Sequence, residues 1–145
     1  MKDVAREMKR ALVILMILIA GLVIAGCGSG TGTVAPGEEF SLKIGESASI
    51  RGEDLEITFL EVLEDSRCPK NVECIWAGRA KSLIELKTGD SAERVELSEP
   101  GLTEPPNSLT YLDYSITFML LPYPEEPDKI EDDEYRLQLT VSKAK

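Results

Sequence analysis

Two cysteines near the middle of the sequence, Cys68 and Cys74, are the residues with the clearest chemical possibilities. A pair of thiols can form a disulfide, act as a redox dithiol or supply ligands to zinc. Redox dithiols usually have two intervening residues, whereas five separate this pair, and two thiols in a chain without histidine make half of a zinc site. In an exported chain we therefore expect a structural disulfide between Cys68 and Cys74.

The segment around these cysteines contains further side chains that are typical of binding sites. Trp76 is the only tryptophan of the chain, and it is either a core aromatic packed against the disulfide or an exposed anchor for a partner. Arg67 and Arg79 are basic residues in an acidic chain, and we expect them to pair with nearby carboxylates such as Asp65 or Glu64. Either arginine, if unpaired, would be a site for an anion or a partner.

Catalysis and tight metal binding find little support in the composition. Without histidine, Ser-His-Asp and Cys-His pairs and imidazole zinc sites are excluded, and Ser66 has no imidazole to activate it. Residues 125–134 are the densest acidic cluster, which predicts either a solvated loop or a site for divalent cations. Such a site would be weak, because the spaced ligands of a calcium-binding loop are absent. We expect no enzyme activity, no cofactor and no dedicated metal site.

The N-terminal residues 1–26 have the layout of an export signal. Four basic and two acidic residues come first, and residues 11–26 then form an uncharged apolar run. As a helix, this run spans about 24 Å, short of a hydrocarbon core of about 30 Å. A basic start, a short apolar run and small residues at its end are typical of a secretory signal peptide.

The residues that end this run, Ile24-Ala25-Gly26-Cys27, resemble the lipobox of bacterial lipoproteins. The resemblance implies that diacylglycerol is joined to the Cys27 thiol, that cleavage before Cys27 makes it the first mature residue, and that this thiol forms no disulfide. We expect an exported protein, anchored in a membrane by lipid, with its domain outside the cytoplasm. The alternative is an uncleaved transmembrane anchor, which gives the same topology.

A tether and an acidic body follow the anchor. Residues 27–37 comprise the lipidated cysteine and a glycine-rich segment, which predicts a flexible tether. The whole chain has a formal charge of −10, and because residues 1–26 carry +2, the remaining 119 residues carry −12. This acidic body argues against nucleic acid as a partner and against attraction to anionic lipid.

Residues 38–145 alternate apolar and polar side chains with a period of two almost throughout, which is typical of half-buried strands. Glycine, proline and aspartate turns separate the apolar positions, and Thr88-Gly89-Asp90 predicts a hairpin turn. We expect one all-β domain, an antiparallel β-sandwich or small barrel of about seven strands. The expected strands lie near residues 39–44, 48–50, 55–63, 79–87, 93–97, 109–121 and 135–141.

The segment from Asp65 to Gly78 reads Asp-Ser-Arg-Cys-Pro, a short spacer, then Cys-Ile-Trp-Ala-Gly. It resembles a motif of small bacterial secreted proteins and lipoproteins of uncharacterised function, and the resemblance implies a disulfide-closed loop on a β-rich domain. We expect a non-catalytic binding domain that contacts an envelope protein through the loop of residues 65–79, with Asp65, Arg67, Trp76 and Arg79 as candidate binding residues. The alternatives are a passive structural component of the envelope and an inhibitor of secreted hydrolases.

Overall fold

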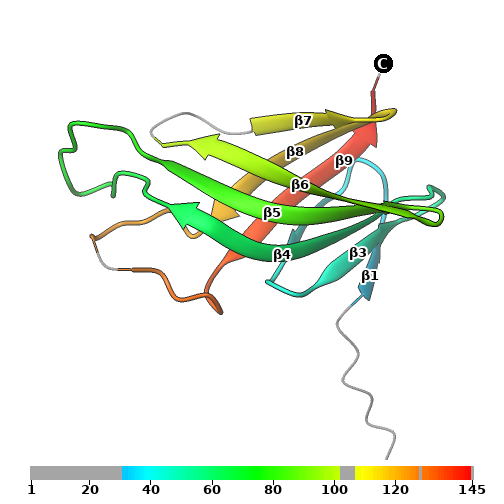
Figure 1. The fold of residues 1–145 in the computed structure, drawn as a ribbon, viewed down its shortest axis with the longest axis horizontal. Coiled ribbons are helices and arrows are strands. Elements are labelled where there is room, and N and C mark those ends of the chain that lie inside the picture. Colours follow the sequence, from blue (N-terminus) through cyan, green and yellow to red (C-terminus); the bar gives the residue numbers. More distant parts are fainter. Residues whose placement is uncertain (1–30, 102–106, 128, 145) are drawn as a thin grey trace, which may run out of the picture.

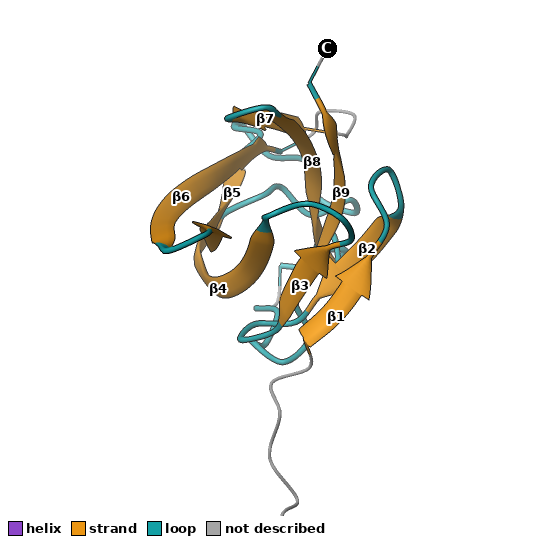
Figure 2. Cartoon of the chain, turned by 90° about the vertical axis from the view of Figure 1, so that its right-hand side faces the viewer, coloured by secondary structure: helices purple, strands orange, loops and turns teal. Residues whose placement is uncertain are grey.

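The computed structural model describes residues 31–101, 107–127 and 129–144. Within these ranges the chain forms nine strands in two sheets that pack face to face, as Figures 1 and 2 show. The all-β prediction is confirmed, and the two-layer arrangement is that of a β-sandwich. The predicted signal peptide and Cys27 lie outside the described residues.

The larger sheet has five strands in the order β1-β3-β4-β5-β6. Its strands are β1 (Thr31–Val34), β3 (Ser47–Ile50), β4 (Glu56–Asp65), β5 (Arg79–Thr88) and β6 (Ser91–Pro100). The pairs β3–β4, β4–β5 and β5–β6 are antiparallel, and Thr88 pairs with Ser91, which confirms the predicted hairpin turn at Gly89-Asp90. We expected an antiparallel sandwich, but the pair β1–β3 is parallel.

The smaller sheet has four strands in the order β2-β9-β8-β7 and is antiparallel throughout. Its strands are β2 (Glu39–Leu42), β9 (Arg136–Lys143), β8 (Tyr114–Leu121) and β7 (Asn107–Tyr111). Burial alternates along β8 and β9, so one face of each strand enters the core. The largest fully buried side chains come from both sheets: Ile57, Phe59, Ile84, Leu86, Ile116, Leu120, Leu137, Leu139 and Val141.

Two irregularities bend β4 and direct the segment that follows it. The register of β4 against β5 shifts between Phe59 and Glu61 and again between Val62 and Glu64. Each shift inserts one extra residue, which increases the local twist and bends the strand. The first shift reverses which side chains face inward, so Leu63 is 45 % exposed, although strict alternation predicts that it faces inward. β4 is an interior strand, as expected, but its second half is not buried on both faces.

Two boundary predictions were wrong. Thr31–Val34 lie within the segment expected to be a flexible tether, yet they form β1 and pair with β3. Residues 109–121 were expected to form one strand, but the chain reverses at Leu112-Asp113, so that β7 and β8 form a hairpin. Leu112 has a positive φ of 49°, a turn conformation that the apolar pattern does not reveal.

No helix in the part of the chain that the structure describes is long and apolar enough to cross a membrane.

Candidate functional site

The predicted disulfide joins Cys68 to Cys74 and closes the loop between β4 and β5. The S–S distance is 2.09 Å and the two Cα atoms are 5.9 Å apart. Backbone hydrogen bonds continue the β4–β5 ladder into the base of the loop, from the Ser66 amide to the Arg79 carbonyl and from the Cys68 amide to the Ala77 carbonyl. The base of the loop is therefore an extension of the sheet.

A glycine makes the close approach at this base possible. Gly78 has a φ of +67°, and a Cβ atom at this position would overlap the carbonyl group of Ser66. Only glycine combines this backbone conformation with this contact.

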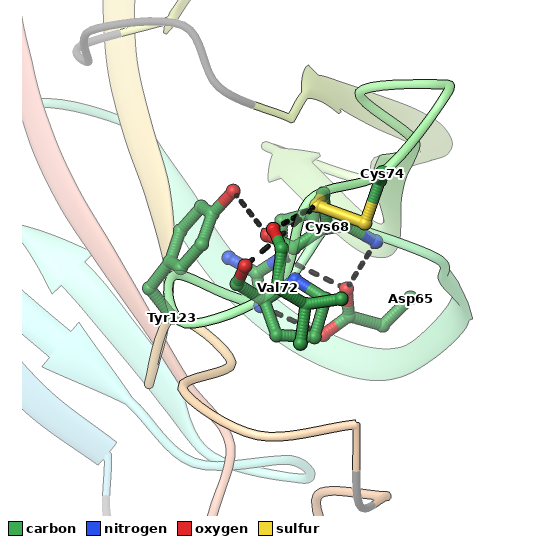
Figure 3. The surroundings of a disulfide bond; sticks show 7 residues. Asp65, Cys68, Val72, Cys74 and Tyr123 are labelled. Atoms are coloured by element: carbon green, nitrogen blue, oxygen red, sulfur yellow. Dashed lines mark hydrogen bonds and ion pairs between the residues drawn. A yellow bond between two sulfur atoms is a disulfide. The ribbon is translucent and has the colours of Figure 1, made fainter.

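One end of the disulfide is held in the interior and the other is exposed. Cys68 is 3 % exposed, and its carbonyl accepts a hydrogen bond of 3.0 Å from the Tyr123 hydroxyl (Figure 3). Cys74 lies at the surface. The loop is thus fixed to the body at Cys68, and the disulfide transmits that constraint to the residues after Cys74.

Arg67 is the buried centre of the site. Its side chain is 0 % exposed and forms a bidentate pair with Asp65, from Nε to Oδ1 at 2.8 Å and from Nη2 to Oδ2 at 2.7 Å. The Tyr135 hydroxyl donates to the same Asp65 Oδ2 at 3.1 Å. Burial, then the charge and hydrogen bond of Asp65, raise the pKa of Tyr135 above its usual value, so the phenol stays protonated and acts as a donor.

The remaining N–H groups of Arg67 reach β6 of the same sheet and the end of β8 in the other sheet. Nη1 donates to Glu99 Oε1 at 3.3 Å and to the Leu120 carbonyl at 2.7 Å, Nη2 donates to the Pro122 carbonyl at 3.0 Å, and the guanidinium lies 5.0 Å from the centre of the Tyr123 ring. Burial lowers the pKa of Arg67, but the hydrogen bond and charge of Asp65 and the charge of Glu99 outweigh it, and the net effect raises the pKa. All five guanidinium donors are used.

Glu99 completes the cluster and was missed by the sequence analysis. It is 7 % exposed, and its Oε2 accepts a hydrogen bond of 2.8 Å from the Leu120 amide. In the described residues, β7 pairs with β8 as far as Asn107 opposite Phe118. Beyond that pair, Glu99 binds the N–H of Leu120 and Arg67 binds its C=O. The available signal was a carboxylate in the inward-facing position two residues after the apolar Leu97.

This geometry corrects the assignment of Arg67 and Asp65 as contact residues. Arg67 is buried with every donor satisfied, and Asp65 accepts from both Arg67 and Tyr135 with its side chain 8 % exposed. The expected pairing of Arg67 with Asp65 is confirmed, as is that of Arg79 with Glu64 at 3.2 Å. Arg67 and Asp65 position the loop, whereas the Arg79 side chain is 55 % exposed at its edge.

Trp76 takes the exposed alternative. Its exposed fraction is 81 %, and that of the preceding Ile75 is 92 %. Val72, in the same loop, is 42 % exposed. Of the five large apolar side chains that are exposed in the described residues, three belong to this loop. Several exposed apolar side chains in one loop are characteristic of an interaction site.

A second loop lies against the first. The Lys70 amide donates to the Pro124 carbonyl at 3.1 Å, and the Lys70 Nζ lies 3.7 Å from Glu125 Oε1, with both side chains largely exposed. These contacts join the disulfide loop to the start of residues 125–134, hereafter the acidic loop. Tertiary structure therefore brings together two segments that the sequence keeps about fifty residues apart.

A cavity of about 340 Å³ lies where these two loops meet. Its wall combines the carboxylates of Asp65 and Glu126 and the cations of Arg67 and Lys129 with apolar side chains. Within the described ranges, no group of three or more cysteine, aspartate or glutamate side chains is placed to hold a metal ion.

No family model, curated protein or solved structure matches this chain.

Proposed function

We propose that this chain is an exported, membrane-anchored envelope lipoprotein whose β-sandwich presents the disulfide loop as a non-catalytic binding surface. The observation that carries the proposal is the exposure of Ile75 and Trp76, at 92 % and 81 %, on a loop closed by the Cys68–Cys74 disulfide. Exposed aromatic residues on rigid supports dominate the energetics of many protein interfaces, because little conformational entropy is lost when they bind.

The buried Arg67 cluster supports a binding role, and not a passive one, for the exposed Ile75 and Trp76. A loop that served only stability would direct its largest apolar side chains into the core, because burying a tryptophan or an isoleucine stabilises a fold by about 1.5–3 kcal/mol. In this loop a hydrogen-bonded arginine is buried and the tryptophan is exposed. The loop thus retains its shape without using Trp76.

The anchor is tested by following a labelled fatty acid into the chain in bacteria. Incorporation of the label and membrane fractionation in the wild type, with loss of both in Cys27→Ser, are the expected results. A chain that takes up no label while Cys27→Ser remains integral to the membrane would contradict the lipid anchor and leave residues 11–26 as a membrane span.

The binding surface is tested by placing a photoreactive amino acid at Ile75 in the full chain and irradiating intact cells. A discrete adduct at position 75, absent when the same amino acid replaces the exposed Asp90 at the β5–β6 turn, is the expected result. The absence of an adduct at position 75, or the same products at both positions, would favour the passive structural role.

A further inference from the structure

Three features occupy this end of the molecule: the exposed side chains of Ile75 and Trp76 on the disulfide loop, hereafter the tip, the cavity, and the acidic loop. In Figure 1 the loop between β4 and β5 and the loop between β8 and β9 occupy the same end of the sandwich. The Asn71 amide donates to the Glu125 carbonyl at 3.4 Å, in addition to the Lys70 contacts, so the two loops are joined through their backbones.

The acidic loop, which lies against the disulfide loop, is strongly negative. The acidic loop contains seven acidic residues and one lysine, a formal charge of −6 within ten residues. Of these acids, Glu125, Glu126 and Glu131–Glu134 are exposed in the structure. Such a charge raises the rate of encounter with a basic surface and disfavours acidic ones.

The cavity adds a place for one side chain between the disulfide loop and the acidic loop. Pro69, Ile130 and Tyr135 supply apolar wall, and Asp65, Glu126 and Lys129 supply polar groups. Asp65 is already engaged by Arg67 and Tyr135, whereas the Glu126 side chain is exposed at the rim. A long side chain with an apolar stem and a cationic end matches this wall, since lysine and arginine bury their stems while their charges face carboxylates.

We infer that the tip, the cavity and the acidic loop form one surface that binds a basic segment of a partner protein, which places an apolar side chain against Trp76 and lysine or arginine side chains along the acidic loop. This inference rests on the proposed function and adds the chemistry of the partner. A membrane is the poorer match, because residues 27–145 carry −12 and an anionic lipid surface repels them. In Figure 1, β1, where the described chain begins, also lies far from the loop between β4 and β5.

The test selects ligands from a random twelve-residue phage library on the full chain and removes those that also bind Trp76→Ser. The expected peptides carry an aromatic or aliphatic residue with at least two lysine or arginine residues. Trp76, as the only tryptophan, reports their binding directly through a blue shift of its fluorescence. Neutral or acidic Trp76-dependent peptides, or no Trp76-dependent peptides, would overturn the inference.

The charge requirement is tested with a synthetic copy of a selected peptide. Glu125→Lys/Glu126→Lys is expected to weaken binding about tenfold at low salt, with a smaller loss at high salt. The matched control, Asp90→Lys/Glu93→Lys, makes the same change in net charge on the β5–β6 hairpin and is expected to bind within twofold of wild type. Equal affinity of the two charge-reversed variants overturns the basic partner.

Two further outcomes separate this inference from the proposed function. The adduct at position 75 in cells is compared with that in Glu125→Lys/Glu126→Lys. An unchanged adduct supports the binding loop and overturns only the basic partner. In the full chain reconstituted into phosphatidylcholine and phosphatidylglycerol vesicles, Trp76 is expected to keep the emission of an exposed tryptophan. A blue shift, with quenching by brominated lipid, makes the membrane the occupant and overturns the inference.

Discussion

Arg67 and Glu99 lie 32 residues apart in the sequence and meet in the interior, with Nη1 of the guanidinium 3.3 Å from Oε1 of the carboxylate. Together they bind both backbone groups of Leu120. The pair connects the two sheets where the disulfide loop leaves β4. It therefore couples the position of an exposed loop to the packing of the core.

Arg67→Met is expected to destabilise the fold by about 3–5 kcal/mol, because it leaves the carboxylates of Asp65 and Glu99 buried without their cation. Urea unfolding followed by far-ultraviolet circular dichroism measures this loss. Arg79→Met, which removes a pair with Glu64 at the surface, should cost less than about 1 kcal/mol. Similar losses in the two variants would show that the buried cluster does not hold the loop.

Trp76→Ala is expected to change the free energy of unfolding by less than about 0.5 kcal/mol, because the side chain is 81 % exposed. Gly78→Ala should instead cost more than about 2 kcal/mol, since its Cβ would overlap the Ser66 carbonyl at a positive φ. Thermal and urea unfolding of both variants gives the comparison. A large loss at Trp76 would mean that the side chain packs against the body in solution.

Removal of the disulfide in Cys68→Ser/Cys74→Ser is expected to cost about 2.4 kcal/mol, the loop-closure entropy of a ring of about seven residues. Trp76 should also become more mobile, because the constraint from Cys68 no longer reaches the residues after Cys74. Steady-state fluorescence anisotropy of Trp76 measures this mobility, and reduction of the wild-type chain should reproduce it. Unchanged anisotropy in both cases would show that backbone contacts alone hold the tip.

Glu53 provides a pH-dependent contribution at the opposite end of the sandwich from the disulfide loop. Hydrogen bonds from Lys143 at 2.7 Å and then from the Tyr114 hydroxyl at 2.9 Å lower the pKa of Glu53 below its usual 4.5. A carboxylate with a lowered pKa contributes stability above its unfolded pKa and loses it as the pH falls through its folded pKa. Glu53→Gln should therefore be less stable than wild type near about pH 7, and the difference should shrink toward about pH 3. A difference that urea unfolding finds constant between these two values would contradict the assignment.

Local sequence predicted those features that depend on neighbours along the chain. Alternation with a period of two predicted the strands, Gly89-Asp90 predicted a hairpin turn, and two cysteines with five residues between them predicted a disulfide. The pairing of Arg67 with Asp65 is also local, since only Ser66 lies between them in the sequence. A strand period or a short loop is specified by nearby residues, so these features need no knowledge of the partner strand.

Only the tertiary structure decided which side chains of the disulfide loop are exposed and which are buried. Arg67 is buried and Trp76 is exposed, and the buried cluster depends on Glu99 in β6 and on Tyr135 just before β9, both distant in the sequence. The bulges in β4 and the approach of the acidic loop to Lys70 arise likewise from register between separated segments. Alternation assigns a residue to one face of its own strand. Which groups meet across the core depends on how the two sheets pack, and the sequence of a single strand does not specify that packing.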